Sequence, residues 1–228
     1  MLKAHCKKHI ILALDITSSD NAIDILSKVA VNIDAVKIGL PLSLAEGCNV
    51  FKEIKKEIDL PILADMKIAD VPHIAKKISR LCFSSGADAI TVHGFVGPST
   101  IEACVEEAGA DKDVIVMTET THVDSSLFME SVAETIAKIA RDAGASGIQA
   151  PGNRPKRVAT MRRIVGDEMV IISCGMGFQG GKEGSALRAG ADFEIYGRSI
   201  YEDENPTEAA RRISFILGEV SGLRKNMV

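Results

Sequence analysis

Short apolar runs rich in β-branched residues alternate along this chain with segments in which apolar residues recur at helical spacing. This alternation is typical of βα units built around a parallel sheet. The runs predict eight strands, at residues 10–15, 35–39, 61–65, 89–93, 114–118, 147–150, 170–173 and 193–196. One-sided apolar stripes predict helices between them, the clearest being Ile74/Ile78/Leu81/Cys82, Val132/Ile136/Ile139/Ala140 and Ala209/Ile213/Ile216/Leu217.

Eight strands, each followed by a helix, predict an α/β fold, a single (β/α)8 TIM barrel that forms one catalytic domain over residues 1–228. Weaker stripes lie at 51–58 and 101–105, and Ser18 and Asp20 predict the start of the first helix. The competing fold is a doubly wound open sheet, which favours a glycine-rich turn after the first strand. Here that turn reads DITSSDN, without glycine.

The composition limits the partners and the compartment. The formal charge is −4 and no face rich in Lys and Arg stands out, so we expect no nucleic-acid partner. No apolar run approaches the roughly 20 residues of a spanning helix, and the start MLKAHCKKH does not resemble a signal peptide. The five cysteines contain no C-x-x-C pair. We therefore expect a cytoplasmic protein without a membrane partner, a disulfide framework or a bound metal.

Charged residues gather where the predicted strands end, which is where barrels of this kind carry their active sites. Strand one ends in Asp15, strand two carries Lys37, and the third is followed through ADMKIADVP by Asp65, Lys67 and Asp70. Residues i and i+2 of a strand share a face, so Asp65 and Lys67 are predicted to point into the same mouth. Any one of these residues fits a structural ion pair, but five charges beside buried chain favour catalysis.

The segment ISCGMGFQGGKEG, residues 172–184, follows the seventh strand. Its glycines let backbone N–H groups approach an anion, and the loops after strands seven and eight are the usual phosphate site of the fold. The eighth strand runs into YGRS, which places Gly197 and Arg198 opposite Gln179. We therefore predict a phosphate site here, with a loop long enough to close over the ligand.

Other polar residues are less specific. His93 is interpreted as a hydrogen-bonded structural residue, and TETTH at 118–122 offers hydroxyls and amides that suit a polar ring edge. No motif for a nicotinamide, a nucleoside triphosphate or zinc occurs, so no cofactor is expected.

Taken together, these motifs resemble the orotidine 5'-monophosphate decarboxylase family, particularly its compact archaeal type, over nearly the whole chain. The resemblance rests on LALD, VKIG, ADMKIADVP, VHGF, TETTH, GMGFQGG and GRSIY. Related sugar-phosphate enzymes share D-x-K-x-x-D but typically carry a magnesium-holding glutamate where this chain has Lys37, which speaks against that metal-dependent branch.

The resemblance implies decarboxylation of orotidine 5'-monophosphate to uridine 5'-monophosphate without a cofactor, in pyrimidine nucleotide synthesis. It implies that Lys67 is the proton donor in a network of Lys37, Asp65, Lys67 and Asp70. It further implies a homodimer in which Asp70 reaches the neighbouring site.

The same resemblance assigns the binding residues. Asp15 and Lys37 are expected to bind ribose hydroxyls, and Thr121 to read the pyrimidine amide edge. The phosphate is expected to contact Gln179, Gly197 and Arg198.

Four residues depart from the family pattern: Ile74 replaces a threonine that contacts ribose, Cys174 replaces a proline, and Thr91 and Gln149 replace apolar residues near the reacting carboxylate. Two alternatives therefore stay open. One is a related enzyme for another phosphorylated substrate, and the other is a nucleotide-binding relative without efficient chemistry.

Overall fold

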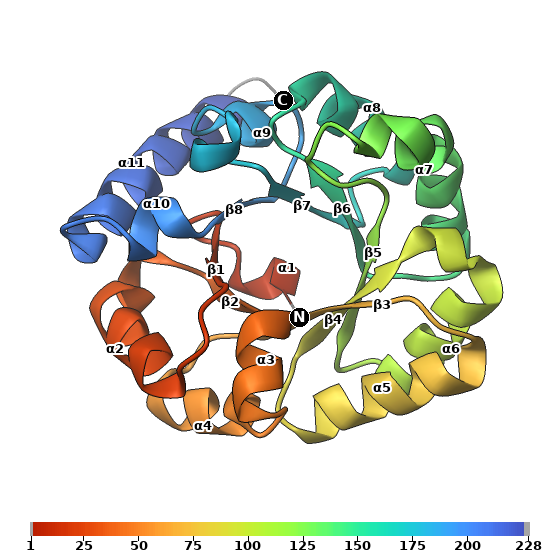
Figure 1. Ribbon diagram of the computed structural model, residues 1–228. Helices are drawn as coiled ribbons and strands as arrows, with labels where there is room; N and C mark the ends of the chain where they lie inside the picture. The colour runs from red at the N-terminus through yellow and green to blue at the C-terminus, as the bar shows by residue number, and fades with distance from the viewer. Residues whose placement is uncertain (1, 226–228) are drawn as a thin grey trace.

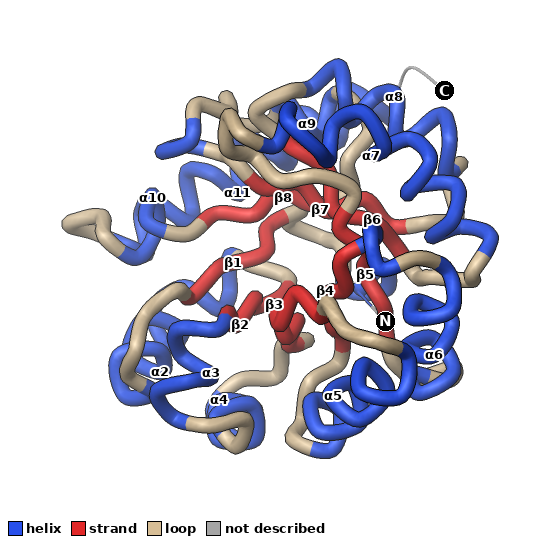
Figure 2. Tube along the Cα trace, turned by 45° about the vertical axis from the view of Figure 1, so that its right-hand side comes forward, coloured by secondary structure: helices blue, strands red, loops and turns tan. Residues whose placement is uncertain are grey.

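The computed structural model describes residues 2–225 of the chain, and its strands form a closed, all-parallel barrel (Figures 1 and 2). The strands follow one another around the ring in chain order. They are β1 (Ile10–Leu14), β2 (Ala35–Gly39), β3 (Ile62–Ile68), β4 (Ala89–His93), β5 (Asp113–Met117), β6 (Gly147–Pro151), β7 (Val170–Cys174) and β8 (Phe193–Tyr196). This architecture confirms the predicted TIM barrel, because β8 pairs with β1 and leaves no open sheet edge.

Helices surround the barrel (Figure 1). The longer ones are α2 (Ser19–Val29), α3 (Leu40–Glu46), α4 (Val50–Glu57), α5 (Pro72–Ser84), α6 (Pro98–Ala108), α7 (Ser125–Asp142), α8 (Pro155–Val165) and α11 (Pro206–Lys225). Shorter elements are α1 (Leu2–His5), α9 (Ser185–Arg188), α10 (Arg198–Tyr201), η1 (Ala30–Asn32), η2 (Gly94–Val96) and η3 (Gly177–Gln179). No helix within residues 2–225 is both long and apolar enough to cross a membrane.

Alternate residues of each strand face opposite sides, which produces two apolar layers. One side contributes to a large cluster with the helices, exemplified by Leu12, Val36 and Ile90. The other side fills the barrel interior with residues such as Ile11 and Leu63. The interior layer ends, toward the carboxyl ends of the strands, in polar side chains rather than apolar ones.

Helix α1 closes the opposite end of the barrel and lies inside the ring of strands in Figure 1. Leu2 is fully buried in the interior cluster, and its backbone N–H donates to Asp113 Oδ2 over 2.6 Å. This helix was not predicted from the sequence. Because the amino end of the barrel is plugged, the functional opening lies at the carboxyl ends of the strands.

Local sequence signals set the helix positions, with corrections to the predicted faces of two helices; in α7, Val132 is 43% exposed, whereas Ile136 and Ala140 are buried as predicted. Ser18 caps α2 as predicted, accepting a hydrogen bond from the Asn21 N–H over 3.4 Å. In α5, however, Leu81 is 61% exposed, and the buried positions are Ala75, Ser79 and Cys82, of which only Cys82 was predicted. The predicted face is therefore rotated from the real one, because α5 packs through small side chains against its neighbours.

The predicted strand ends agree within a residue except at β3, which continues beyond Asp65 to Ile68. The pairing of β3 with β4 shifts register between Ala64 and Ile68. This irregularity falls on the charged segment of the site.

Candidate active site

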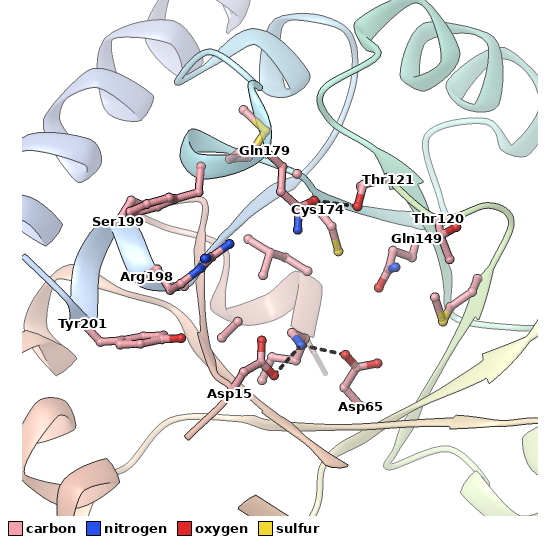
Figure 3. Close-up of a pocket in the computed structure, with 18 of the residues that line it drawn as sticks. Asp15, Asp65, Thr120, Thr121, Gln149, Cys174, Gln179, Arg198, Ser199 and Tyr201 are labelled. Atoms are coloured by element: carbon pink, nitrogen blue, oxygen red, sulfur yellow. Dashed lines mark hydrogen bonds and ion pairs between the residues drawn. The ribbon is translucent and has the colours of Figure 1, made fainter. Parts of the chain in front are cut away.

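The carboxyl ends of the strands surround a cavity of about 490 Å³, which is a normal size for a small-molecule site (Figure 3). Eight of the nine site residues predicted from the sequence line it. They are Asp15, Lys37, Asp65, Lys67, Thr121, Gln179, Gly197 and Arg198. The fold thus brings together residues from six different βα connections or strands.

A single buried carboxylate lies between two lysines at one side of the cavity. Asp65 Oδ2 is 2.7 Å from Lys37 Nζ and 2.6 Å from Lys67 Nζ. Asp15 Oδ1 approaches Lys37 Nζ at 3.6 Å. The Asp65 side chain is 3% exposed and that of Lys37 8%, whereas that of Lys67 is 39% exposed. Of the two lysines, Lys67 is therefore the more accessible to a ligand in the cavity.

Electrostatic interactions keep the buried pair of Asp65 and Lys37 ionised. Burial alone would raise the pKa of Asp65, but the charges of Lys37 and Lys67 outweigh it and hold that pKa well below its usual range. Burial would lower the pKa of Lys37, but the carboxylates of Asp65 and Asp15 outweigh it and raise that pKa. The site therefore presents a fixed anion and fixed cations at neutral pH.

The backbone of Lys67 adopts a left-handed conformation, with φ of +47°, within the irregular part of β3. A non-glycine residue in this region is strained and needs support from its surroundings. Thr91 supplies it: its hydroxyl accepts a hydrogen bond from the Lys67 N–H over 2.9 Å and donates to Asp65 Oδ1 over 2.8 Å. Asp65 and Lys67 therefore meet through a bulge, not through the regular strand alternation predicted from the sequence.

Gly39, the last residue of the VKIG motif, makes room for Asp15. A Cβ atom at position 39 would lie 2.6 Å from Asp15 Oδ1, which is closer than van der Waals contact allows. The glycine thus lets β2 approach the Asp15 carboxylate.

Asp70 is the predicted site residue that does not line the cavity. It lies exposed in the connection from β3 to α5, where its Oδ1 accepts a hydrogen bond from the Val71 N–H over 2.7 Å. The expected convergence of five charges on one mouth is therefore wrong for the single chain, in which only Asp15, Lys37, Asp65 and Lys67 meet.

Thr121 and Gln179 join two loops on the far side of the cavity (Figure 3). The Thr121 hydroxyl donates to Gln179 Oε1 over 2.6 Å. Asn153, after β6, donates through Nδ2 to the carbonyl oxygens of Thr121 (3.1 Å) and Gln179 (3.4 Å). Gly175, with φ of +88°, has no room for a Cβ, which would lie 2.9 Å from Thr121 Cγ2. These contacts place the TETTH segment against the glycine-rich loop.

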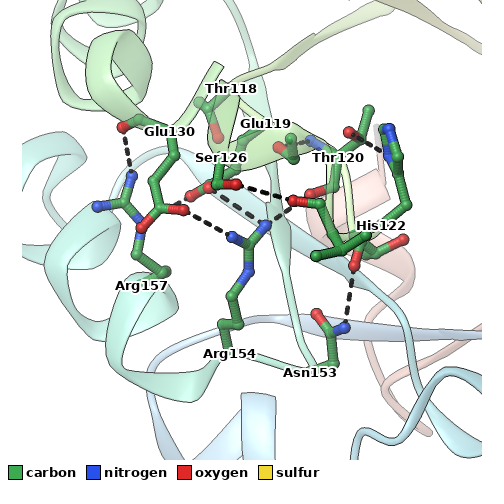
Figure 4. A network of polar contacts seen from close by, with 12 residues as sticks. Thr118, Glu119, Thr120, His122, Ser126, Glu130, Asn153, Arg154 and Arg157 are labelled. Atoms are coloured by element: carbon green, nitrogen blue, oxygen red, sulfur yellow. Dashed lines mark hydrogen bonds and ion pairs between the residues drawn. The ribbon is translucent and has the colours of Figure 1, made fainter. Parts of the chain in front are cut away.

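Behind Thr121, a buried ion cluster supports the same segment (Figure 4). The side chain of Glu119 is fully buried and accepts from Arg157 Nε over 2.8 Å, with Arg154 at 3.3 Å. Arg154 also donates to the carbonyl oxygen of Thr120 over 2.6 Å. Asn153 and Arg154 were not predicted as site residues, because nothing in the sequence indicated which side chains would face the loop from β6.

Arg198 and Gln179 lie at the predicted phosphate end of the cavity (Figure 3). The Arg198 guanidinium lies over the Phe178 ring, 4.7 Å from its centroid, which orients it without using its hydrogen-bond donors. Ser199, also lining the cavity, has a buried Oγ without a hydrogen-bond partner among the described residues. This end therefore offers several donors to an anion.

Glu194 anchors the segment that follows the glycine-rich loop. It is fully buried and accepts hydrogen bonds from the N–H groups of Gly184, Ala186 and Leu187, each over 2.9 Å. The Tyr196 hydroxyl donates to it over 2.6 Å. One end of the loop is thus fixed to β8, beside Gly197 and Arg198.

His93 lies at the end of β4, against Phe95 at 4.7 Å between ring centroids. Burial, and then the charge of Lys67, lower the pKa of His93, so its ring is neutral at pH 7. The buried Nδ1 of His93 has no hydrogen-bond partner among the described residues, so the predicted hydrogen bonding is not found at this atom. Across residues 2–225, no group of three or more His, Cys, Asp or Glu side chains is arranged to hold a metal ion.

Comparison with known proteins gives the family. The model of the orotidine 5'-phosphate decarboxylase / HUMPS family matches residues 8–213. The chain belongs to this family. An orotidine 5'-phosphate decarboxylase of Methanosarcina acetivorans is 47% identical over 205 residues, which cover 90% of this chain and 92% of the relative. The decarboxylase of Thermococcus kodakarensis is 38% identical over 91% of this chain and 95% of its own length.

Solved decarboxylase structures share the fold. The enzyme of Methanocaldococcus jannaschii, in complex with the inhibitor BMP, superposes with a TM-score of 0.86 at 35% identity, covering 92% of this chain and 98% of that one. The enzyme of Pyrococcus horikoshii gives a TM-score of 0.85 at 35% identity, over 91% and 98% of the two chains. The predicted resemblance to orotidine 5'-monophosphate decarboxylases is therefore confirmed.

Three of the four departures from the decarboxylase pattern cluster around the lysines. Gln149 and Cys174 line the cavity, and Thr91 holds Asp65 and Lys67. Ile74 lies apart, half-buried in the first turn of α5.

Proposed function

We propose that this chain converts orotidine 5'-monophosphate to uridine 5'-monophosphate with Lys67 as the proton donor. The family and the names of its relatives support the reaction, a carboxy-lyase step of pyrimidine nucleotide synthesis. The observation that carries the residue assignment is the Asp65 carboxylate held between Lys37 and Lys67 at the cavity wall.

The difficult step is the formation of a vinyl carbanion on the pyrimidine ring. The bond from the ring carbon to the carboxylate breaks, carbon dioxide leaves, and the electron pair stays on the carbon. A proton then passes from Lys67 Nζ to that carbon, and solvent restores the ammonium. A cation fixed by Asp65 stabilises the developing negative charge without reorganising during the reaction. Asp65 faces the departing carboxylate, which raises the energy of the bound substrate relative to neutral carbon dioxide.

The remaining residues bind the parts of the nucleotide that do not react. Asp15 and Lys37 contact ribose hydroxyls, and Thr121 reads the amide edge of the pyrimidine. The phosphate contacts the Gln179 side chain, the Gly197 backbone and the Arg198 guanidinium. Binding energy from the phosphate then helps to close the glycine-rich loop and to position the reacting end.

We further propose that the reaction proceeds without a cofactor in the cytoplasm, and that nucleic acid is not a partner. The formal charge of −4 supports the last point.

The working unit that we propose is a homodimer in which Asp70 enters the neighbouring site. Asp70 is exposed at the same end of the barrel as the cavity. Exposed apolar side chains lie on three consecutive βα connections around it: Leu44 after β2 (79% exposed), Val71 after β3 (52%) and Phe95 after β4 (59%). An apolar rim of this kind is typical of a protein interface.

Mixing two inactive variants tests the shared site. Lys67→Ala and Asp70→Ala dimers should each be inactive, but a heterodimer carries one site with neither change. Random exchange makes half of the dimers mixed, with one of two sites intact, so about a quarter of the wild-type rate should return. Activity that stays at the mean of the two parents would show that Asp70 acts within its own chain or not at all.

The proposed reaction is tested by incubating orotidine 5'-monophosphate with purified, metal-stripped protein. Loss of the conjugated carboxylate changes the ultraviolet absorbance of the pyrimidine, so conversion is followed directly. Rapid conversion without metal is the expected result. No conversion, with uridine 5'-monophosphate still bound, would instead identify a nucleotide-binding relative, and a requirement for metal would indicate a different substrate.

A further inference from the structure

The cavity contains a buried amide without a protein partner. Gln149 is 5% exposed, lines the cavity beside Met117 and Cys174, and its Oε1 has no hydrogen bond within the described part of the chain. Figure 3 shows its amide pointing into the cavity, on the side of Asp65 and away from Arg198. The Gln149 amide therefore lies at the end of the cavity that is remote from the proposed phosphate contacts.

The main chain fixes this orientation. Gln149 is the third residue of β6, with its carbonyl oxygen accepting from the Thr118 N–H (3.2 Å) and the Thr118 hydroxyl (2.9 Å). Its pairing with Met117 on β5 and Ile172 on β7 places the side chain on the interior face. The amide cannot leave the cavity without disturbing the barrel.

Two other groups that line the cavity, Asp65 and Cys174, do not serve as partners of Gln149. Asp65 accepts from Lys37 and Lys67 through Oδ2 and from Thr91 through Oδ1. Burial raises the pKa of the Cys174 thiol to about 12, so it is a neutral and weak hydrogen-bonding group. A buried amide oxygen without a hydrogen bond is unfavourable, so this arrangement points to a partner supplied by a ligand.

We propose that Gln149 is a specificity-determining residue that hydrogen-bonds the substituent on the pyrimidine carbon facing Lys67. This inference rests on the proposed function, since it assumes a nucleotide whose phosphate lies at Arg198 and whose reacting carbon lies at Lys67. The amide offers both a donor and an acceptor. The site therefore selects pyrimidine nucleoside monophosphates with a hydrogen-bonding group at that carbon over those with a hydrocarbon group: a carboxamide can donate to Gln149 Oε1, and a carboxylate can accept from Gln149 Nε2.

The test measures binding of three ligands: uridine 5'-monophosphate, its 6-carboxamide and its 6-methyl derivative. The wild type should bind the carboxamide about tenfold more tightly than the methyl compound, which is the value of one net hydrogen bond. Gln149→Met, which keeps the size of the side chain, should reduce this preference to within about twofold, while affinity for uridine 5'-monophosphate stays within about twofold. Gln149→Leu provides a second variant should the first fail to fold.

A preference that survives in Gln149→Met, or a wild type that does not discriminate the two derivatives, would overturn the inference and assign the amide to a bound water. Neither result contradicts the proposed function, because uridine 5'-monophosphate binding and orotidine 5'-monophosphate turnover by the wild type are measured separately. Failure of the proposed function is distinct, because the wild type would then fail to convert orotidine 5'-monophosphate, whatever its preference between the carboxamide and the methyl derivative.

Discussion

Replacing Lys67 with alanine should lower kcat for orotidine 5'-monophosphate by at least about 10⁴-fold, because the variant loses both the proton donor and the cation that stabilises the carbanion. Binding of uridine 5'-monophosphate should stay within about tenfold of wild type, since the phosphate contacts are distant from position 67. Single-turnover kinetics and calorimetric titration measure the two quantities separately.

Arg198→Ala is the matched control, because it removes a cation from the other end of the same cavity. It should mainly raise KM and weaken product binding, with a smaller effect on kcat. A Lys67→Ala enzyme that decarboxylates at the normal rate would remove Lys67 from the mechanism. Equal loss of product binding in both variants would show that Lys67 serves binding instead.

The second large effect is expected for Asp65→Asn, which should remove activity and also destabilise the fold by about 3–5 kcal/mol. The substitution leaves Lys37, with a side chain 8% exposed, facing only Asp15 at 3.6 Å. Burying the Lys37 ammonium without Asp65 costs more free energy of folding than the original Lys37–Asp65 ion pair contributed. Denaturant unfolding measures the loss, and Asp24→Asn, which breaks an exposed pair with Lys28, should change stability by less than about 1 kcal/mol.

The pH dependence of stability distinguishes two causes of this destabilisation: a Lys37 charge that has lost Asp65, and a simple loss of packing. The depressed pKa of Asp65 gives the wild type stability that is present above the unfolded pKa of about 3.9 and is lost as the pH falls. The raised pKa of Lys37 gives stability that is present below about 10.4 and is lost as the pH rises through the folded pKa. The contribution of this pair to wild-type stability should therefore be constant between about pH 5 and 9.

In Asp65→Asn, the pKa shift of Lys37 on folding should change sign. Without Asp65, burial should lower the pKa of Lys37 below its unfolded value, so the unfolded state binds more protons and stability rises with pH. Melting temperatures measured from pH 6 to 9 check this slope. A variant as insensitive to pH as the wild type would show that Lys37 finds another partner. Adding Lys37→Met should recover stability but not activity, because it removes the unpaired charge.

The extent of sequence-based prediction differs between the strands and their irregularities. Alternation of apolar runs located all eight strands, since burial on both faces of a barrel strand produces a continuous apolar run. It did not predict the bulge at Lys67, because one left-handed residue leaves no periodic signal. The buried face of α5 was also misplaced: the tight packing that selects Ala75 and Ser79 depends on neighbouring elements.

The candidate site likewise contains residues that were predicted from the sequence and residues that were not. Asp15, Lys37, Asp65 and Lys67 were predicted to meet because parallel strands bring their carboxyl ends to one edge, and they do meet. Asn153 and Arg154 were missed, although they hold the Thr121 segment, because their partners are backbone carbonyls more than 25 residues away. The family itself was recognised from the motifs and confirmed by the comparisons.

The sequence by itself determined the class of fold, the family and the set of charged residues at the strand ends, because these depend on local periodicity and on chain order around a parallel sheet. Only the tertiary structure decided that Asp65 is shared by two lysines, that Thr91 fixes both Asp65 and the Lys67 backbone, and that the Gln149 amide oxygen has no hydrogen-bond partner among the described residues. Those features depend on distances between side chains from different strands, which are set by barrel closure and side-chain packing and leave no pattern in the sequence.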